Sequence, residues 1–390
     1  MKIEIDAARL ARALSSARAV TASVNIAHIL NHCLLVAEGE TLRLKTSNFD
    51  MTAEMTLAAH VLEPGQCTAP AAMLAHALSC VREGGEVRIE KGARDRVIVR
   101  SGRNRHEMLS MDPEAFGGLP DIAAPVSEFI APLHEWLGWA SPAAGTGDKR
   151  PEQCGVWLSI DRDRMVIAAS DGFHGLIRRE NMPLGADKMP DCFLPNAVVS
   201  VIGKLFSEPA RVLLDSNRLD VTGDGVRLSA KLGDVRRPPF ERAFERKEFD
   251  SFTAARADLQ AAIKAVLPLT TVKDSRLEVL VSGGQLRIAC RSDLGEIATS
   301  DADIENPPSS TIRFATNPRH LVTLLAAAGT PAVRVSISTD PHIASIVTVD
   351  PVDGWDGSAA TAIMRTDPHI DLAKVLTPEA LAAGDMQEAA

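Results

Sequence analysis

The stretch Asp6–Val20, DAARLARALSSARAV, predicts a short amphipathic helix near the start of the chain. Its first residue is an aspartate, whose side chain can accept hydrogen bonds from the free amides of the first turn. Leu10 and Leu14 then share one face of the helix, while Arg9 and Arg12 project from the opposite face. We therefore expect the leucine face to pack on a hydrophobic core and the arginine face to remain in water.

The same helical pattern returns twice, in Ala131–Ala140 (APLHEWLGWA) and in Ala254–Val266 (AARADLQAAIKAV). The starts of the three stretches lie roughly 124 residues apart, which is a domain length rather than the period of a solenoid repeat. Each block also contains a second predicted helix, at residues 70–82, 196–206 and 317–328. Predicted strands surround both helices in each block, so the sequence indicates one fold used three times.

The fold class predicted from this repeat is α+β, with three tandem domains. Their expected boundaries are residues 1–123, 124–247 and 248–366, and the joints fall in proline-bearing or charged segments. Residues 367–390 differ in character, because they contain five acidic residues against one lysine. We interpret them as an acidic C-terminal tail outside the repeat.

The composition restricts the possible functions. No apolar run reaches the roughly 18 residues that a membrane helix needs, and the charged N-terminus, MKIEIDAARL, does not resemble a signal peptide, so we expect a cytoplasmic protein. The six cysteines show no metal-ligand spacing and are predicted to be buried free thiols. With a net charge of −9 and no tyrosine, a DNA-binding surface would need lysine and arginine gathered on one face, without base stacking on tyrosine.

No catalytic motif accompanies the residues that could suggest an enzyme. Asp171 and His174 occur without a nucleophile elbow, a P-loop or an HExxH sequence. Asp161 and Asp163 fit a hairpin turn better than a metal site. We therefore expect a protein that is not an enzyme and that has no metal and no cofactor.

Several short motifs recur in the order and spacing of a known family. They are Arg100-Ser101-Gly102-Arg103 leading to Phe116 and Leu119-Pro120, then Ala169-Ser170-Asp171-Gly172, and finally Lys231-Leu232 leading to Pro238 and Phe240. With the three tandem blocks, they resemble the bacterial DNA polymerase III beta subunit, the beta sliding clamp family. The resemblance covers about residues 1–366.

This resemblance implies a ring-shaped, head-to-tail homodimer with helices facing a central hole and antiparallel sheets outside. Such a ring encircles double-stranded DNA without reading its sequence and tethers the replicative polymerase, so it acts as a processivity factor. The implied partners are DNA polymerase III subunits, the clamp loader and other proteins with clamp-binding motifs. The alternative is a specialised clamp-like module, from a plasmid, phage or resistance locus, that binds partners but tethers DNA weakly.

The resemblance also implies a positively charged inner surface. The expected DNA-binding residues are Arg9, Arg12, Lys149, Arg150, Lys204, Arg256, Lys264 and Arg319. Lys149 and Arg150 lie in a loop that matches a DNA-contacting loop of the family, although Pro151 and Glu152 replace its adjacent aromatic residues. The helix at 131–140 departs from the pattern, because it offers only a histidine and a glutamate.

A groove between the second and third domains binds partner peptides in the family. The matching positions are Ser170, Gly172, Phe173, His174, Leu176, Pro238, Arg242, Ala243, Asn317, His320, Ser345, Ile363, Met364 and Arg365. The usual Asp-Gly-His-Arg-Leu is here Asp-Gly-Phe-His-Gly-Leu, with one extra residue and no arginine. Since the acidic tail starts beside Met364, we hypothesise that it partly covers or modulates this groove.

The ring joint implied by the family involves three positions. His106 replaces an aromatic residue expected at the edge of the first domain, while Met108 and, opposite it, Leu269 are apolar. A histidine there predicts a weaker or pH-sensitive dimer.

Overall fold

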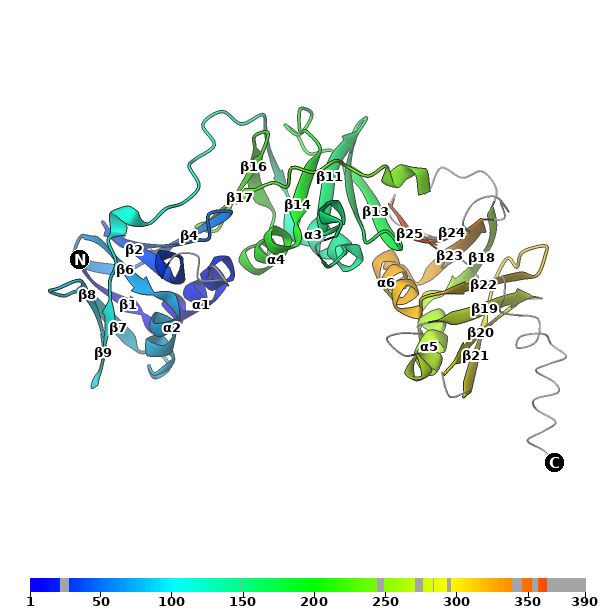
Figure 1. The fold of residues 1–390 in the computed structure, drawn as a ribbon, viewed down its shortest axis with the longest axis horizontal. Helices are drawn as coiled ribbons and strands as arrows, with labels where there is room; N and C mark the ends of the chain where they lie inside the picture. The colour runs from blue at the N-terminus through cyan, green and yellow to red at the C-terminus, as the bar shows by residue number, and fades with distance from the viewer. Residues whose placement is uncertain are drawn as a thin grey trace. The chain divides into compact units, whose positions relative to one another are not determined.

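The computed structural model describes residues 1–21, 28–147, 149–243, 249–270, 276–282, 284–292, 296–338, 346–352 and 357–362 (Figure 1). Its described residues belong to two compact units. Unit 1 comprises Met1–Gly138, Leu158–Met165 and Asn181–Arg236, and unit 2 comprises Trp139–Trp157, Val166–Glu180 and the described residues from Arg237 onward.

The helix predicted at the start of the chain is confirmed as α1 (Ala7–Ala17), after strand β1 (Lys2–Asp6). The Asp6 carboxylate accepts a 2.7 Å hydrogen bond from the Arg9 amide and so caps the helix. Leu10 and Leu14 are fully buried in the core of unit 1, whereas Arg9 is exposed. The amphipathic pattern therefore gives the helix its orientation.

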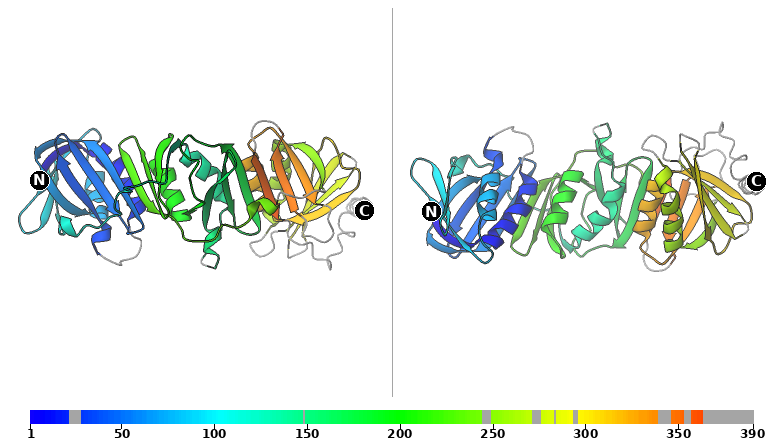
Figure 2. Two further views of the ribbon diagram at one scale, coloured as in Figure 1. Left: turned by 90° about the horizontal axis from the view of Figure 1, so that it is seen from above. Right: turned by 90° about the horizontal axis from the view of Figure 1, so that it is seen from below.

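Unit 1 contains two further whole helices, each preceded by a strand that ends in proline. They are α2 (Ala71–Ser79) and α4 (Asn196–Leu205). The helix α3 (Leu133–Ala140) begins in unit 1 and ends in unit 2. In this unit the helices lie on one side of the sheets, and the strands cover the other side (Figure 2).

Two antiparallel sheets form the strand layer of unit 1. One has the order β5-β1-β7-β8-β9, and the other has the order β10-β15-β16-β17-β4-β3-β2-β6. The strands not yet given are β2 (His32–Glu38), β3 (Thr41–Ser47), β4 (Met51–Ala58), β5 (His60–Glu63), β6 (Gly65–Pro70), β7 (Glu86–Lys91), β8 (Arg96–Ser101), β9 (Asn104–Leu109), β10 (Ser127–Ala131), β14 (Cys192–Pro195), β15 (Ala210–Leu214), β16 (Arg218–Gly223) and β17 (Val226–Lys231). Pairing of β17 with β4 joins the second block to the first in one sheet, with Val226 opposite Met55.

Unit 2 contains the helices α5 (Arg256–Val266) and α6 (Pro318–Ala328), which lie beside each other. Its strands are β13 (His174–Asn181), β18 (Phe249–Ala255), β19 (Leu277–Ser282), β20 (Gln285–Arg291), β21 (Ile297–Asp303), β22 (Ile312–Thr316), β23 (Ala332–Ser338), β24 (Ile346–Pro351) and β25 (Gly357–Ala362). The strands β11 (Gly155–Asp161) and β12 (Arg164–Ser170) have residues in both units, and the last residue of β13, Asn181, belongs to unit 1. One sheet contains the run β12-β13-β25-β24-β23-β18, and another has the order β21-β20-β19-β22.

The first and third blocks of the sequence share one order of elements. A strand and a helix open each of them (β1-α1 and β18-α5), and a later strand leads into a second helix (β6-α2 and β22-α6). The second block has β10-α3 and β14-α4 in the same places. We propose three domains at residues 1–123, 124–247 and 248–366 on this basis.

Some predicted elements differ from those observed. Residues His28–Asn31 form a 3-10 helix before β2. The strand β9, after the Arg100–Arg103 motif, was not predicted, because its residues NRHEML are mostly polar. Short 3-10 helices also occur at Arg18–Val20, Pro113–Ala115, Ser141–Ala143, Pro151–Gln153, Phe240–Ala243 and Leu267–Leu269. Within the described residues, no helix is long and apolar enough to cross a membrane.

Candidate peptide and DNA interfaces

The turn between β12 and β13 carries the Asp171-Gly172-Phe173-His174 sequence. Asp171 Oδ1 accepts hydrogen bonds of 2.8 Å from the backbone amides of both Phe173 and His174. Gly172 has a φ of +87°, a left-handed conformation that glycine adopts at little cost. The extra residue relative to the family motif is thus accommodated in a compact turn, and the Phe173 side chain is left 66% exposed.

His174 returns into the protein from this turn and stacks on His320 of α6. The two ring centroids lie 4.1 Å apart, with an angle of 10° between the ring planes. Asp171 lies beside both rings, because its Oδ1 is 3.0 Å from His174 Nδ1 and its Oδ2 is 3.9 Å from His320 Nε2. The fold thereby brings together three predicted or suspected site residues from two distant parts of the sequence.

Charge in this cluster is concentrated on the aspartate. Burial opposes ionisation of Asp171, but the adjacent His174 imidazole and hydrogen bonds from the His174 and Phe173 amides outweigh it and lower the pKa of Asp171 to about 2. For His320, burial and the adjacent His174 lower the pKa, and Asp171 only partly opposes them. Asp171 is therefore ionised at neutral pH, and the neutral form of His320 is favoured.

Asp171, His174 and His320 offer ligand atoms that all lie within 4.8 Å of one another. A metal ion shared by two imidazoles must lie near the plane of each ring, because the nitrogen lone pairs are in those planes. Two nearly parallel rings cannot meet this condition without turning out of their stack. The absence of a metal site stays a prediction, and the ring geometry favours it.

Other residues predicted for the peptide groove have structural roles in unit 2. Ser170 Oγ donates a 2.7 Å hydrogen bond to the His174 carbonyl, and the Asn317 side chain accepts one of 3.0 Å from the Arg319 amide at the start of α6. Leu176 is buried, and Pro238 is half-buried. The residues Ser345, Ile363, Met364 and Arg365, and the side chains of Arg242 and Ala243, lie outside the described part of the chain.

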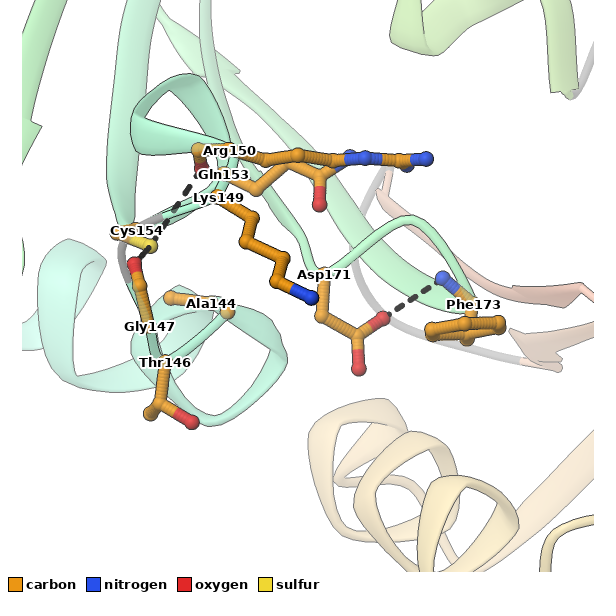
Figure 3. Close-up of a pocket in the computed structure, with 10 residues that line it drawn as sticks. Ala144, Thr146, Gly147, Lys149, Arg150, Gln153, Cys154, Asp171 and Phe173 are labelled. Atoms are coloured by element: carbon orange, nitrogen blue, oxygen red, sulfur yellow. Dashed lines mark hydrogen bonds between the residues drawn. The ribbon is translucent and has the colours of Figure 1, made fainter.

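The loop with Lys149 and Arg150 lines a hollow of about 770 Å³ next to the Asp171 turn (Figure 3). Other lining residues include Thr146, Gln153, Cys154, Asp171 and Phe173. A methyl group built on Gly172 would lie 3.1 Å from Arg150 Nη1 and 2.8 Å from Gln153 Nε2, so both side chains pass close to the turn. From the sequence we predicted that Lys149 and Arg150 bind DNA. We did not predict that they lie next to the Asp171 turn.

In unit 1, candidate DNA-binding residues gather on α1 and α4. Arg9, Arg12 and Lys204 are all exposed, and the two helices are in contact. Between them lies a hollow of about 490 Å³ whose lining includes Arg18 and Lys204. The sequence analysis missed Arg18, although its place as the third arginine of the opening stretch was a usable signal.

Unit 2 contributes Lys264 and Arg319, both exposed, from α5 and α6. Arg256 is different, because its Nε donates a 2.8 Å hydrogen bond to the Thr330 carbonyl and its side chain is only partly exposed. Its guanidinium thus joins the start of α5 to the segment before β23. A contribution of all these residues to DNA binding remains a prediction.

Comparison with known proteins shows which proteins this chain is similar to. The model of the DNA polymerase III beta subunit N-terminal domain matches residues 1–120. The beta sliding clamp of Caulobacter vibrioides (strain NA1000 / CB15N) is 23% identical over 369 residues, covering 90% of this chain and 97% of that protein. The N-terminal part of the chain thus matches a family model of the DNA polymerase III beta subunit, and the chain is similar over most of its length to beta sliding clamps.

Solved beta clamps share the fold of this chain. A crystal structure of the Caulobacter crescentus beta sliding clamp matches with a TM-score of 0.88 at 21% identity, covering 94% of this chain and 99% of that one. The Helicobacter pylori beta clamp, solved bound to a DNA ligase peptide, matches with a TM-score of 0.84 at 18% identity, covering 94% and 100%. This similarity to beta sliding clamps agrees with the prediction that the chain is not an enzyme.

The residues predicted for the ring joint differ in exposure. Met108 is only 1% exposed and belongs to the core of unit 1, and its place at a dimer interface remains a prediction. The next residue of β9, Leu109, is 54% exposed, because successive side chains of a strand point to opposite faces. His106 packs edge-to-face with His76, at a centroid distance of 6.2 Å, and Leu269 is partly exposed.

Proposed function

We propose that this chain is a DNA sliding clamp, a processivity factor that encircles duplex DNA as a head-to-tail homodimer and tethers the replicative polymerase. The observation that carries this proposal is the alignment of nearly the whole chain, without loss of a domain, to beta sliding clamps. The topological link of a closed ring needs no strong contact with the DNA. Weak contacts with the phosphate backbone suffice, and they allow the ring to slide.

The charge distribution supports this function in a chain with a net charge of −9. Arg9, Arg12 and Lys264 extend from the outer faces of helices, and none of them forms an ion pair with another described residue. Cations that are not neutralised by neighbouring carboxylates remain available to phosphates. In this proposal these helices face the hole of the ring.

Partner binding would use the groove that contains the Asp171 turn and α6, as predicted from the family. Exposed Phe173 offers apolar surface, and the expected partners are short linear segments of polymerase, loader and repair proteins. The expected place of action is the cytoplasm, where the DNA of a bacterial cell lies.

The alternative is a clamp-like module that binds partners but tethers DNA weakly. One observation favours it: α3, which in this proposal faces the hole, carries His134 and Glu135 but no lysine or arginine. The positive potential of the second domain would then depend on residues such as Lys204 of α4.

Retention on circular DNA separates the two functions. The full-length chain is incubated with a cognate clamp loader, ATP and a nicked circle, and the DNA is then linearised. We expect retention on the circle and loss after linearisation, because a closed ring slides off an end. If an active loader leaves nothing on the circle, while a control clamp is retained, the processivity function is refuted and the partner-binding module is favoured.

A further inference from the structure

Two histidines meet at the open edge of the first sheet. Strand β9 is the last strand of that sheet and, among the described strands, pairs with β8 alone. His106 of β9 lies opposite Val99, on the strand face that also carries the buried Met108. His106 is half-buried, and its ring packs edge-to-face against His76 of α2, with the ring centroids 6.2 Å apart and an angle of 86° between the ring planes.

The surface around this pair is apolar or uncharged. Helix α2 contains no charged or titratable residue besides His76. Met73 lies one turn earlier on the same face of the helix and is 52% exposed. The charged side chains of β9, Arg105 and Glu107, point to the opposite face of the strand, where they pair with each other at 2.6 Å. The two imidazoles are therefore the titratable groups of this surface.

Neither histidine has a counter-ion in the part of the chain that the structure describes. His60, at the other edge of the same sheet, differs, because its Nδ1 lies 3.4 Å from Glu4 Oε2. The titratable residues that follow α2 are all exposed: Cys80, Arg82 and Glu83. Protonation of both His76 and His106 would thus place two like charges side by side, and such charges repel each other.

We propose that the His76–His106 pair makes closure of the ring depend on pH, with the closed dimer favoured when both rings are uncharged. The inference rests on the proposed function, because it takes the edge formed by β9 and α2 as part of the ring joint. In that joint the second protomer covers the edge, and burial disfavours the charged form of an imidazole. The sequence indicated pH sensitivity from His106 alone, and His76 adds a second titratable ring and a direction.

The direction follows from proton linkage. If closure buries both imidazoles in the neutral form, the open chain binds more protons than the closed dimer, so the dimer becomes weaker as the pH falls. An imidazole that titrates near pH 6.5 when free and stays neutral in the dimer weakens a joint about fourfold between pH 8 and pH 6. Two such groups in one joint weaken it about fifteenfold.

Sedimentation velocity of the full-length chain, at constant ionic strength from pH 8 to pH 6, measures the dissociation constant of the dimer. We expect this constant to rise at least about fifteenfold over the range, with unchanged far-ultraviolet circular dichroism. The double variant His76→Gln with His106→Phe has no titratable ring at the joint, so its dissociation constant should be the same at both pH values. Each single variant should retain about half of the logarithmic change.

The matched control is His60→Gln, which removes a histidine from the opposite edge of the same sheet. Its dimer should keep the full pH dependence of the unmodified chain. This comparison separates titration at the joint from a general effect of pH on the sheet.

Three results overturn the inference. They are a dissociation constant that does not change with pH, a dimer that becomes tighter on acidification, and a pH dependence that persists in the double variant. A chain that is monomeric at pH 8 and micromolar concentration also counts against it. Retention on circular DNA at pH 8 judges the clamp function separately, so retention there by a dimer without pH dependence overturns this inference and leaves the clamp function standing.

Discussion

The ion pair between Asp220 of β16 and Arg227 of β17 offers a sharp test of what stabilises the sheet in which β17 pairs with β4. Arg227 Nη2 lies 2.5 Å from Asp220 Oδ2, and its Nη1 lies 2.7 Å from Asp121 Oδ1. The Asp220 side chain is only 2% exposed, and its Oδ1 has no hydrogen-bond partner among the described residues. An unpaired charge on the buried Asp220 carboxylate would therefore destabilise the folded protein.

Replacing Arg227 with methionine leaves the Asp220 carboxylate buried without its cation. Breaking a buried pair in this way costs about 3–5 kcal/mol of unfolding free energy, and we expect the lower end because Arg227 is itself 34% exposed. The double variant with Asp220→Asn removes the stranded charge, so it should recover most of the loss. Asp121→Asn should cost less than about 1 kcal/mol, since Asp121 is 80% exposed.

Urea unfolding followed by circular dichroism measures these free energies. Hydrogen exchange of the β17 and β4 amides localises the effect, because Arg227 lies opposite Glu54 in that strand pair. If Arg227→Met is no less stable than the double variant, the buried carboxylate is not the cause and the reasoning is refuted.

Three further predictions concern pH, the backbone and DNA. Because folding lowers the pKa values of Asp171 and His320, both groups should stabilise the protein at neutral pH. The contribution of His320 should be lost below about pH 6.5, and that of Asp171 between about pH 4 and pH 2. Unfolding free energies of His320→Gln and Asp171→Asn, measured across this pH range, test both expectations. Gly185→Ala should lower the melting temperature, since a methyl group there would lie 2.1 Å from the Glu128 carbonyl oxygen at a φ of +90°; an unchanged melting curve would contradict this. Lys264→Glu should weaken DNA binding and flatten its salt dependence by about one unit of slope, and an unaltered slope would exclude a phosphate contact.

The repeat was predictable because its signals are local. The cap and leucine face of α1 lie within one stretch, and the proline before α2 and α4 marks where each begins. Strand β9 was missed because only Met108 of its six residues is buried, which leaves almost no apolar alternation to detect. On the same strand, burial of Met108 rather than Leu109 depends on which face of the strand meets the core. The packing of the whole sheet determines that face, and the sequence of the strand alone does not.

The site was less predictable, because its parts come from different elements. The resemblance named His174 and His320, yet nothing in the sequence indicated that their rings stack or that Asp171 lies beside both. The positions of Lys149 and Arg150 matched a DNA-contacting loop, whereas the fold places them along the hollow at the Asp171 turn. Such contacts depend on how separate elements pack, so they follow only from the tertiary structure.

Divergence in this chain is uneven between the frame and the groove. The strands and helices keep the clamp order at 23% identity to a curated relative, because a repeated fold needs only apolar residues at the right period. The Asp171 turn, by contrast, has gained a residue, and a buried histidine follows the exposed Phe173. In the proposed function this turn belongs to the peptide groove, so the added residue is expected to alter which peptides bind.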